Sequence, residues 1–149
     1  MKKVFKQFED TLHEIQKLKE VKESQLVDPI SEGKWSIREI IGHLYYWDKY
    51  ILENMVPAMF NGANLPQFPD HDQHNKEAIS YLIDYSVDEI IDAFTETRKE
   101  LIESTLIVVE DVRFTIGSGN RQFSVESFIK MFVEHDIHHL KQIKEKLSH

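Results

Sequence analysis

Four segments of the chain repeat apolar residues three or four positions apart, which is the spacing of one helix face. They cover about residues 4–26, 37–55, 87–106 and 125–147. The second shows the pattern clearly, with apolar side chains at Ile37, Ile40, Ile41, Leu44, Trp47, Ile51 and Met55. Because four such faces can be buried against one another, the pattern predicts an all-α four-helix bundle.

Local sequence marks where three of these helices begin. Ser36 is followed three residues later by Glu39, and Ser86 by Glu89, and both pairs are capping boxes that satisfy free amides at a helix start. Ser124 is the expected N-cap of the last helix. The many charged positions along the long helices are expected to lie on solvated faces.

The connections between the helices are long. Residues 57–75 hold three of the four prolines and are expected to be irregular, with a short helix over about 75–85. Within residues 107–123, Val112, Phe114 and Ile116 alternate with polar residues before a Gly-rich turn at 117–120. This alternation predicts a small hairpin before the last helix.

Length and composition narrow the classes of protein that fit. A chain of 149 residues favours one domain, expected over 1–149. Cysteine is absent, which excludes disulfides, thiolate metal ligands and a cysteine nucleophile. A net charge of -8 disfavours nucleic acid as a partner.

No apolar run approaches the ~20 residues of a membrane span. The N-terminus also becomes charged too soon for a signal peptide, so we expect a cytoplasmic protein.

The histidines of the last helix differ in where they point. His139 lies within the apolar face, between Phe132 and Ile143, and His135 lies one turn earlier at the edge of that face. His138 points away from it. Since residues i and i+4 share one helix face, the rings of His135 and His139 can converge on one ion, at the ~2.0–2.1 Å typical of zinc–nitrogen bonds.

A third ligand has to come from a facing helix, and His43 is the candidate. It lies at the edge of the apolar face of its helix, between Ile40 and Trp47. Two other interpretations stay open at this point. A histidine on an apolar face is often a core residue with a satisfied hydrogen bond, and three such residues can form a pH-sensitive cluster without metal.

The other histidines show weaker patterns. His71 and His74 are expected in a solvated loop, where they can also line the mouth of a pocket. His13 is expected on a polar helix face, and His149, the last residue, is expected to fray. Metal-binding imidazoles need partners for their second nitrogen, and the candidates, in order of preference, are Asp48, Gln142 and Glu134.

Two segments resemble motifs of the DinB/YfiT-like proteins, which are metal-binding four-helix bundles. The first is similar to the family's W-S-x-x-E-x-x-x-H-L segment and consists of Trp35-Ser36-Ile37-Arg38-Glu39-Ile40-Ile41-Gly42-His43-Leu44. The second is similar to its H-x-x-H-H-x-x-Q signature and consists of His135-Asp136-Ile137-His138-His139-Leu140-Lys141-Gln142. Lys141 departs from the Gly of many relatives, but it lies outside the ligand set.

The resemblance implies that His43, His135 and His139 bind a divalent metal. We expect zinc or nickel, with iron or manganese as alternatives. Three histidines leave a coordination position open, where water or an external thiol can be activated.

Some relatives are S-transferases that use low-molecular-weight thiols such as bacillithiol or mycothiol. A small-molecule substrate and such a thiol are therefore the expected partners. Relatives often form homodimers, but no exposed apolar stripe in this sequence requires one, so the sequence leaves the oligomeric state open. The alternatives are a metal-dependent hydrolase, a non-catalytic metal-binding or stress-related bundle protein, and a metal-free dimerisation module.

Overall fold

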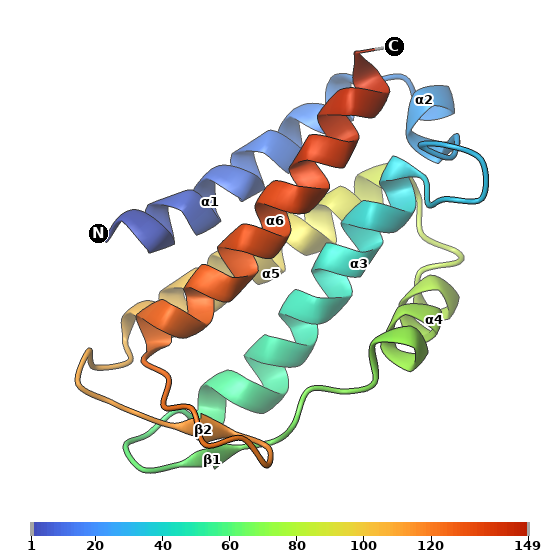
Figure 1. The fold of residues 1–149 in the computed structure, drawn as a ribbon. Coiled ribbons are helices and arrows are strands. Elements are labelled where there is room, and N and C mark those ends of the chain that lie inside the picture. The colour runs from blue at the N-terminus through green and yellow to red at the C-terminus, as the bar shows by residue number, and fades with distance from the viewer. Residues whose placement is uncertain (1, 149) are drawn as a thin grey trace.

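A computed structural model describes residues 2–148 and contains the four long helices that the sequence predicts. They are α1 (Lys3–Gln16), α3 (Ile37–Tyr50), α5 (Val87–Leu106) and α6 (Val125–Leu147). Helix α5 packs against both α1 and α3, and α6 packs along α1 and meets α3 over a shorter stretch (Figure 1). The all-α bundle is therefore confirmed. The expectation for His149 lies outside the described residues.

The predicted helix starts agree closely with the structure. Ser36 and Ser86 each form the expected capping box, and Ser124 caps α6 through the backbone N–H of Ser127. Helix α3 continues as one π-helical turn (Ile51–Met55) and a short 3-10 turn (Val56–Ala58) that contains Pro57. Proline at this point ends the helix, since it lacks the N–H that the next turn needs.

The first predicted helix, 4–26, is wrong as one continuous element. Helix α1 ends at Gln16 and is followed by a 3-10 turn (Lys17–Glu20), extended Val21, and the short helix α2 (Glu23–Val27). Of the seven residues 19–25 that follow buried Leu18, Val21 is the one apolar residue, and it packs against the core from an extended conformation. The break lets Leu26 join the buried cluster beside the start of α3.

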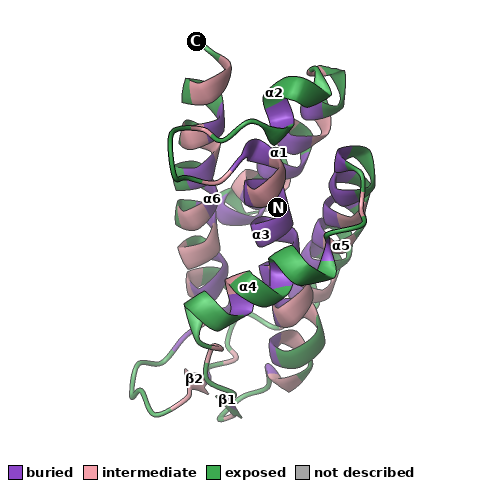
Figure 2. Cartoon of the chain, turned by 90° about the vertical axis from the view of Figure 1, so that its right-hand side faces the viewer, coloured by how far each residue is buried: buried purple, intermediate pink, exposed green. Residues whose placement is uncertain are grey.

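The short helix between α3 and α5 begins earlier than predicted. Helix α4 spans His71–Tyr81, because the Asp70 side chain accepts a hydrogen bond from the backbone N–H of Gln73 (3.0 Å) and caps its start. It crosses the outside of the bundle and packs on α3 (Figure 2). The expected loop at His71 and His74 is therefore corrected: both are helical, and His74 is buried.

The two long connections meet at one end of the bundle. Strands β1 (Asn64–Leu65) and β2 (Thr115–Ile116) pair in parallel. The predicted hairpin is present as a single antiparallel bridge, in which Phe114 and Phe123 exchange backbone hydrogen bonds of 3.1 and 2.8 Å. Among residues 2–148, no helix combines the length and the apolar composition needed to cross a membrane.

Two apolar clusters form the core, and a polar layer separates them. On α3, Leu44 belongs to one cluster and Ile51 to the other, and buried Asp48 lies between them. On α6, Val133 and Ile143 belong to different clusters, and Asp136 and His139 lie between them. On α5, Arg98 holds the same intermediate position. The predicted metal ligands therefore lie at the middle of the bundle.

Candidate metal centre

Three histidine side chains converge where α3 meets α6. The Nε2 atom of His135 lies 3.0 Å from Nε2 of His43 and 3.2 Å from Nε2 of His139. One ring nitrogen from each residue lies within 4.8 Å of the other two. A tetrahedral zinc site with bonds of ~2.0–2.1 Å separates its nitrogens by about 3.3 Å. The spacing of the three rings is thus close to that of a metal site.

A hydrogen bond fixes which nitrogen of His43 carries its proton. Nδ1 of His43 lies 2.9 Å from Oδ1 of Asn75 on α4, and the indole N–H of Trp47 approaches the same atom at 3.4 Å. Because an indole N–H only donates, that atom of Asn75 has to be the acceptor oxygen. Nδ1 of His43 is therefore the donor, and its Nε2 keeps a lone pair that faces the other two rings.

His139 is held in the same way. Its Nδ1–H donates to Oε1 of Gln142 at 2.8 Å, which leaves the lone pair of Nε2 directed at His135. Nε2 of His135 carries at most one hydrogen and can satisfy only one of its two neighbours. At least one nitrogen pair therefore brings two lone pairs together, an arrangement that a cation relieves.

Electrostatics keep these imidazoles neutral. Burial, followed by the neighbouring rings of His135 and His139, lowers the pKa of His43 to about 3. Burial, followed by the His139 ring, lowers the pKa of His135 to about 4, and burial also lowers the pKa of His139. Neutral imidazole is the form that binds metal, so the three rings have the protonation state of ligands at neutral pH.

Comparison with known proteins decides the family. The model of the DinB superfamily matches residues 7–143, which is most of the chain. The chain belongs to the DinB superfamily. A search of curated proteins gave no match.

Two solved structures share the fold of this DinB-superfamily chain. YfiT from Bacillus subtilis, described as a probable metal-dependent hydrolase with an unusual four-helix bundle topology, aligns with a TM-score of 0.70 and 16% identity, covering 97% of this chain and 83% of its own. A mycothiol-dependent maleylpyruvate isomerase aligns with a TM-score of 0.67 and 16% identity, covering 92% of this chain and 58% of its own. At these identities the likeness establishes the fold alone.

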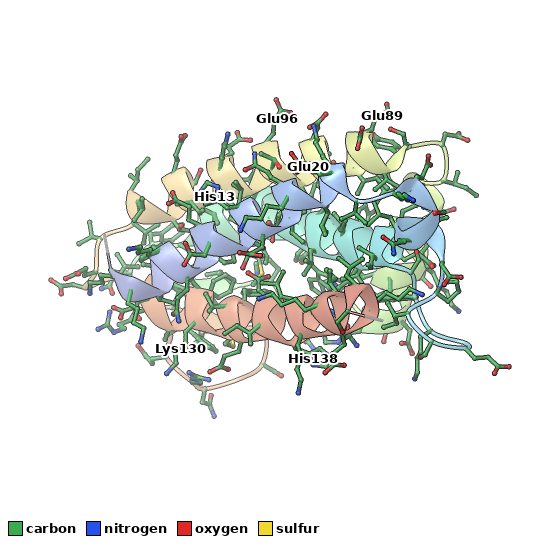
Figure 3. All side chains as sticks on the ribbon, turned by 90° about the horizontal axis from the view of Figure 1, so that it is seen from above. His13, Glu20, Glu89, Glu96, Lys130 and His138 are labelled. Carbon is green, nitrogen blue, oxygen red and sulfur yellow. The ribbon has the colours of Figure 1, made fainter. Side chains whose placement is uncertain are left out.

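The remaining histidines of this DinB-superfamily chain lie apart from the converging trio. His138 is exposed and points away from the bundle (Figure 3), as the helix geometry predicts. His74 is buried with its ring 4.2 Å from that of Trp47, and its Nε2 has no hydrogen-bond partner within residues 2–148. His71 is exposed and lines a pocket beside the trio.

The partners expected for the imidazoles are only partly those found. Gln142 holds His139 as predicted. Glu134 is exposed, and Asp48 pairs with Arg98 instead of a histidine, so both of these expectations are wrong. The sequence does not indicate Asn75, because no spacing in it shows that α4 lies across α3.

Arg98 forms a second polar cluster in this layer of the DinB fold. Its Nε donates to Oδ2 of Asp48 at 2.6 Å, and its Nη1 donates to Oδ2 of Asp136 at 2.8 Å and to the backbone oxygen of Phe8 at 3.1 Å. These partners belong to α3, α6 and α1, so one guanidinium on α5 joins all four long helices. The expectation that charges on these helices face solvent is therefore wrong for Arg98 and Asp136.

A pocket of about 260 Å³ opens beside the trio. His43 and His135 form one side of it, and α3, α4, α6 and the loop before α4 supply the rest. The other residues that line it are Trp47, Phe68, His71, Asn75, Met131 and Phe132. A small molecule in this pocket lies directly against two of the three converging imidazoles.

Proposed function

We propose that His43, His135 and His139 bind one divalent metal ion through Nε2, with zinc or nickel as the preferred ion. The proposal rests on one observation: three neutral imidazoles bring lone pairs to within 3.0 and 3.2 Å of a shared atom, with too few hydrogens to satisfy them. Asn75 and Gln142 hold two of the rings by their Nδ1 atoms, as second partners of metal-binding histidines do.

The adjoining pocket supports an enzymatic rather than a structural role, because structural zinc sites fill all four positions with protein ligands. We infer that the chain is a metal-dependent S-transferase acting with a low-molecular-weight thiol. The bound metal supplies the positive charge that acidifies a thiol and makes its sulfur nucleophilic. The sulfur has to come from a co-substrate, since the chain has no cysteine.

The residues of the pocket have separate roles in this reaction. The co-substrate's sulfur forms a bond to an electrophilic carbon, and the leaving group departs with the electron pair of the bond that breaks. The thiol proton passes to His71, whose imidazole lines the pocket outside the ligand set. Trp47 and Phe68 cover the reacting groups and exclude water that competes with the thiol.

A metal-dependent hydrolase is the second candidate. The same open position takes water, which a bound metal acidifies toward pKa ~7. The similarity to YfiT, described as a probable metal-dependent hydrolase, favours this alternative, and the similarity to a mycothiol-dependent isomerase favours thiol chemistry.

Metal binding and thiol transfer can be tested in sequence with protein that carries no histidine tag. We expect about one zinc or nickel ion per chain after dialysis, and chelator-sensitive conjugation of a small thiol to 1-chloro-2,4-dinitrobenzene. Failure to bind zinc, nickel or manganese contradicts the metal site. Metal binding with ester hydrolysis but no thiol conjugation selects the hydrolase.

A further inference from the structure

We infer that the apolar wall of the pocket beside the three histidines binds the uncharged, apolar part of the electrophilic substrate, such as an aryl group, and excludes anionic groups. This inference rests on the proposed function, because it assigns a substrate class to that same site. It follows from the walls of the pocket, from the polar atoms within them and from their charge.

Aromatic and thioether side chains form most of the wall. The rings of Trp47 and Phe68 meet edge to face at 6.2 Å, and those of Phe68 and Phe132 at 6.0 Å. Met131 extends this surface along α6. Edge-to-face aromatic walls favour another ring, and methionine adapts to irregular apolar shapes.

Three of the polar atoms in the wall are paired with one another. The Trp47 indole N–H and Nδ1–H of His43 both donate to Oδ1 of Asn75. Apart from the metal-facing nitrogens, His71 is the remaining titratable group among the described residues that line the pocket. A ligand in the apolar part therefore finds few hydrogen-bonding groups.

The charge of the pocket lining also favours an uncharged ligand. None of the described residues that line the pocket is Lys, Arg, Asp or Glu. In the apolar part of the pocket, away from the metal proposed at the three histidines, an anion loses its hydration and finds no cationic side chain to compensate. An unpaired charge is costly to bury. The chain's net charge of -8 adds long-range repulsion. Any carboxylates of the thiol therefore have to stay outside this part of the site.

The volume sets an upper limit on size. At about 260 Å³, the pocket lies below the usual range for ligand sites, ~300–1,000 Å³. One or two fused rings fit such a space, whereas a larger conjugated system has to project through its mouth.

The test uses two probes with one ring system, 1-naphthalenemethanol as the neutral form and 1-naphthoate as the anion. Binding is measured by calorimetry on the full chain at pH 7.5 in the presence of a chelator, so that no metal attracts the carboxylate. We expect the alcohol to bind at least about tenfold more tightly than the anion. Equal or tighter binding of naphthoate overturns the inference.

Two lysine variants on α6 locate the effect. Phe132→Lys places a cation in the pocket wall and should raise the affinity for naphthoate relative to the alcohol by at least about tenfold. Ile137→Lys makes the same charge change at a position that is 56% exposed and outside the pocket, and should leave the ratio unchanged. A shift of the ratio in both variants, or in neither, places the probes elsewhere on the chain.

The outcome of these measurements is independent of whether the proposed function is correct. They are made without metal or thiol, so a chain that binds no metal can still show the preference for the neutral probe. Conversely, a metal-binding chain that prefers the anion keeps its metal site and loses this assignment of the substrate.

Discussion

Two polar clusters share the middle layer of the bundle and are built in opposite ways. The Arg98 cluster is charged and closed, because its donors are matched to two carboxylates and one carbonyl from three other helices. The histidine cluster has no formal charge, and its nitrogen lone pairs outnumber the hydrogens available to them. It also borders the pocket of about 260 Å³, whose lining includes no member of the Arg98 cluster among the described residues.

This difference indicates that the Arg98 cluster stabilises the fold and that the histidine cluster binds a ligand. A network with every donor used has nothing left for a ligand, so its role is to fix how the helices pack. Burial raises the pKa of Asp48 to about 6 despite its contact with Arg98, which shows how unfavourable buried charge is even when paired. The histidine cluster holds unused lone pairs and is therefore where an ion can bind.

The largest effect is expected from breaking the Arg98 cluster. Arg98→Met leaves two buried carboxylates without a counter-charge and should lower the free energy of unfolding by about 3–5 kcal/mol. Urea denaturation measures this, with Lys99→Met on the exposed face of α5 as the control. A loss below about 1 kcal/mol is the size of an exposed ion pair and contradicts the comparison.

A triple variant tests why that loss occurs. Asp48→Leu and Asp136→Leu, combined with Arg98→Met, remove all three charges and should recover most of the lost stability, because replacing a whole buried network with apolar groups is often neutral. If the triple variant is no more stable than Arg98→Met alone, packing rather than unpaired charge explains the effect.

The next effect concerns the ligands. His139→Ala removes one of three converging nitrogens and should weaken zinc binding by more than the about 10–100-fold that the loss of an outer hydrogen-bond partner costs. His138→Ala, the adjacent but exposed position, should leave affinity within a factor of about two. Competition with a coloured chelator measures both, and equal loss in the two variants places the site elsewhere.

Local signals in the sequence were enough to predict the presence of the four long helices and the side of α6 that carries the site, but not the end of α1 at Gln16. Capping boxes gave the starts of α3 and α5, and helical spacing distinguished His139 from His138. The capping role of Asp70 is not evident from the sequence, because its helix has only a weak apolar face, and the sequence therefore predicts a loop at His71.

Partners from distant elements were the part that could not be predicted. Arg98 has the sequence environment of an exposed helix residue, and its burial depends on two aspartates 50 and 38 positions away. Asn75 meets His43 only because α4 crosses α3. Spacing along one helix carries information about that helix's own faces, and it carries none about which residue of another helix lies opposite.

Two further predictions concern pH, and the first is on stability. Burial lowers the pKa of His43 to about 3 and of His135 to about 4, against 6.5 for an ordinary histidine. Between these values the unfolded chain binds protons that the folded chain does not, so the free energy of unfolding of the metal-free protein falls as pH decreases. The free energy of unfolding is highest above pH 6.5, where the histidines are neutral in both states, and it falls progressively toward pH 3. Urea denaturation at several pH values measures this loss. His43→Gln should flatten this dependence.

Metal affinity should depend on pH far less than the affinity of a site made of three exposed histidines. Three ordinary histidines compete with protons below pH 6.5 and together weaken metal binding by up to about a thousandfold per pH unit. The buried rings of His43 and His135 are still neutral at pH 5.5, so zinc affinity should fall less than about tenfold between pH 7 and pH 5.5. Calorimetric titration with zinc at the two pH values measures the difference. A steep loss of zinc affinity means that the rings take up protons as exposed histidines do. The histidine cluster would then not be uncharged, and its contrast with the charged Arg98 cluster would fail.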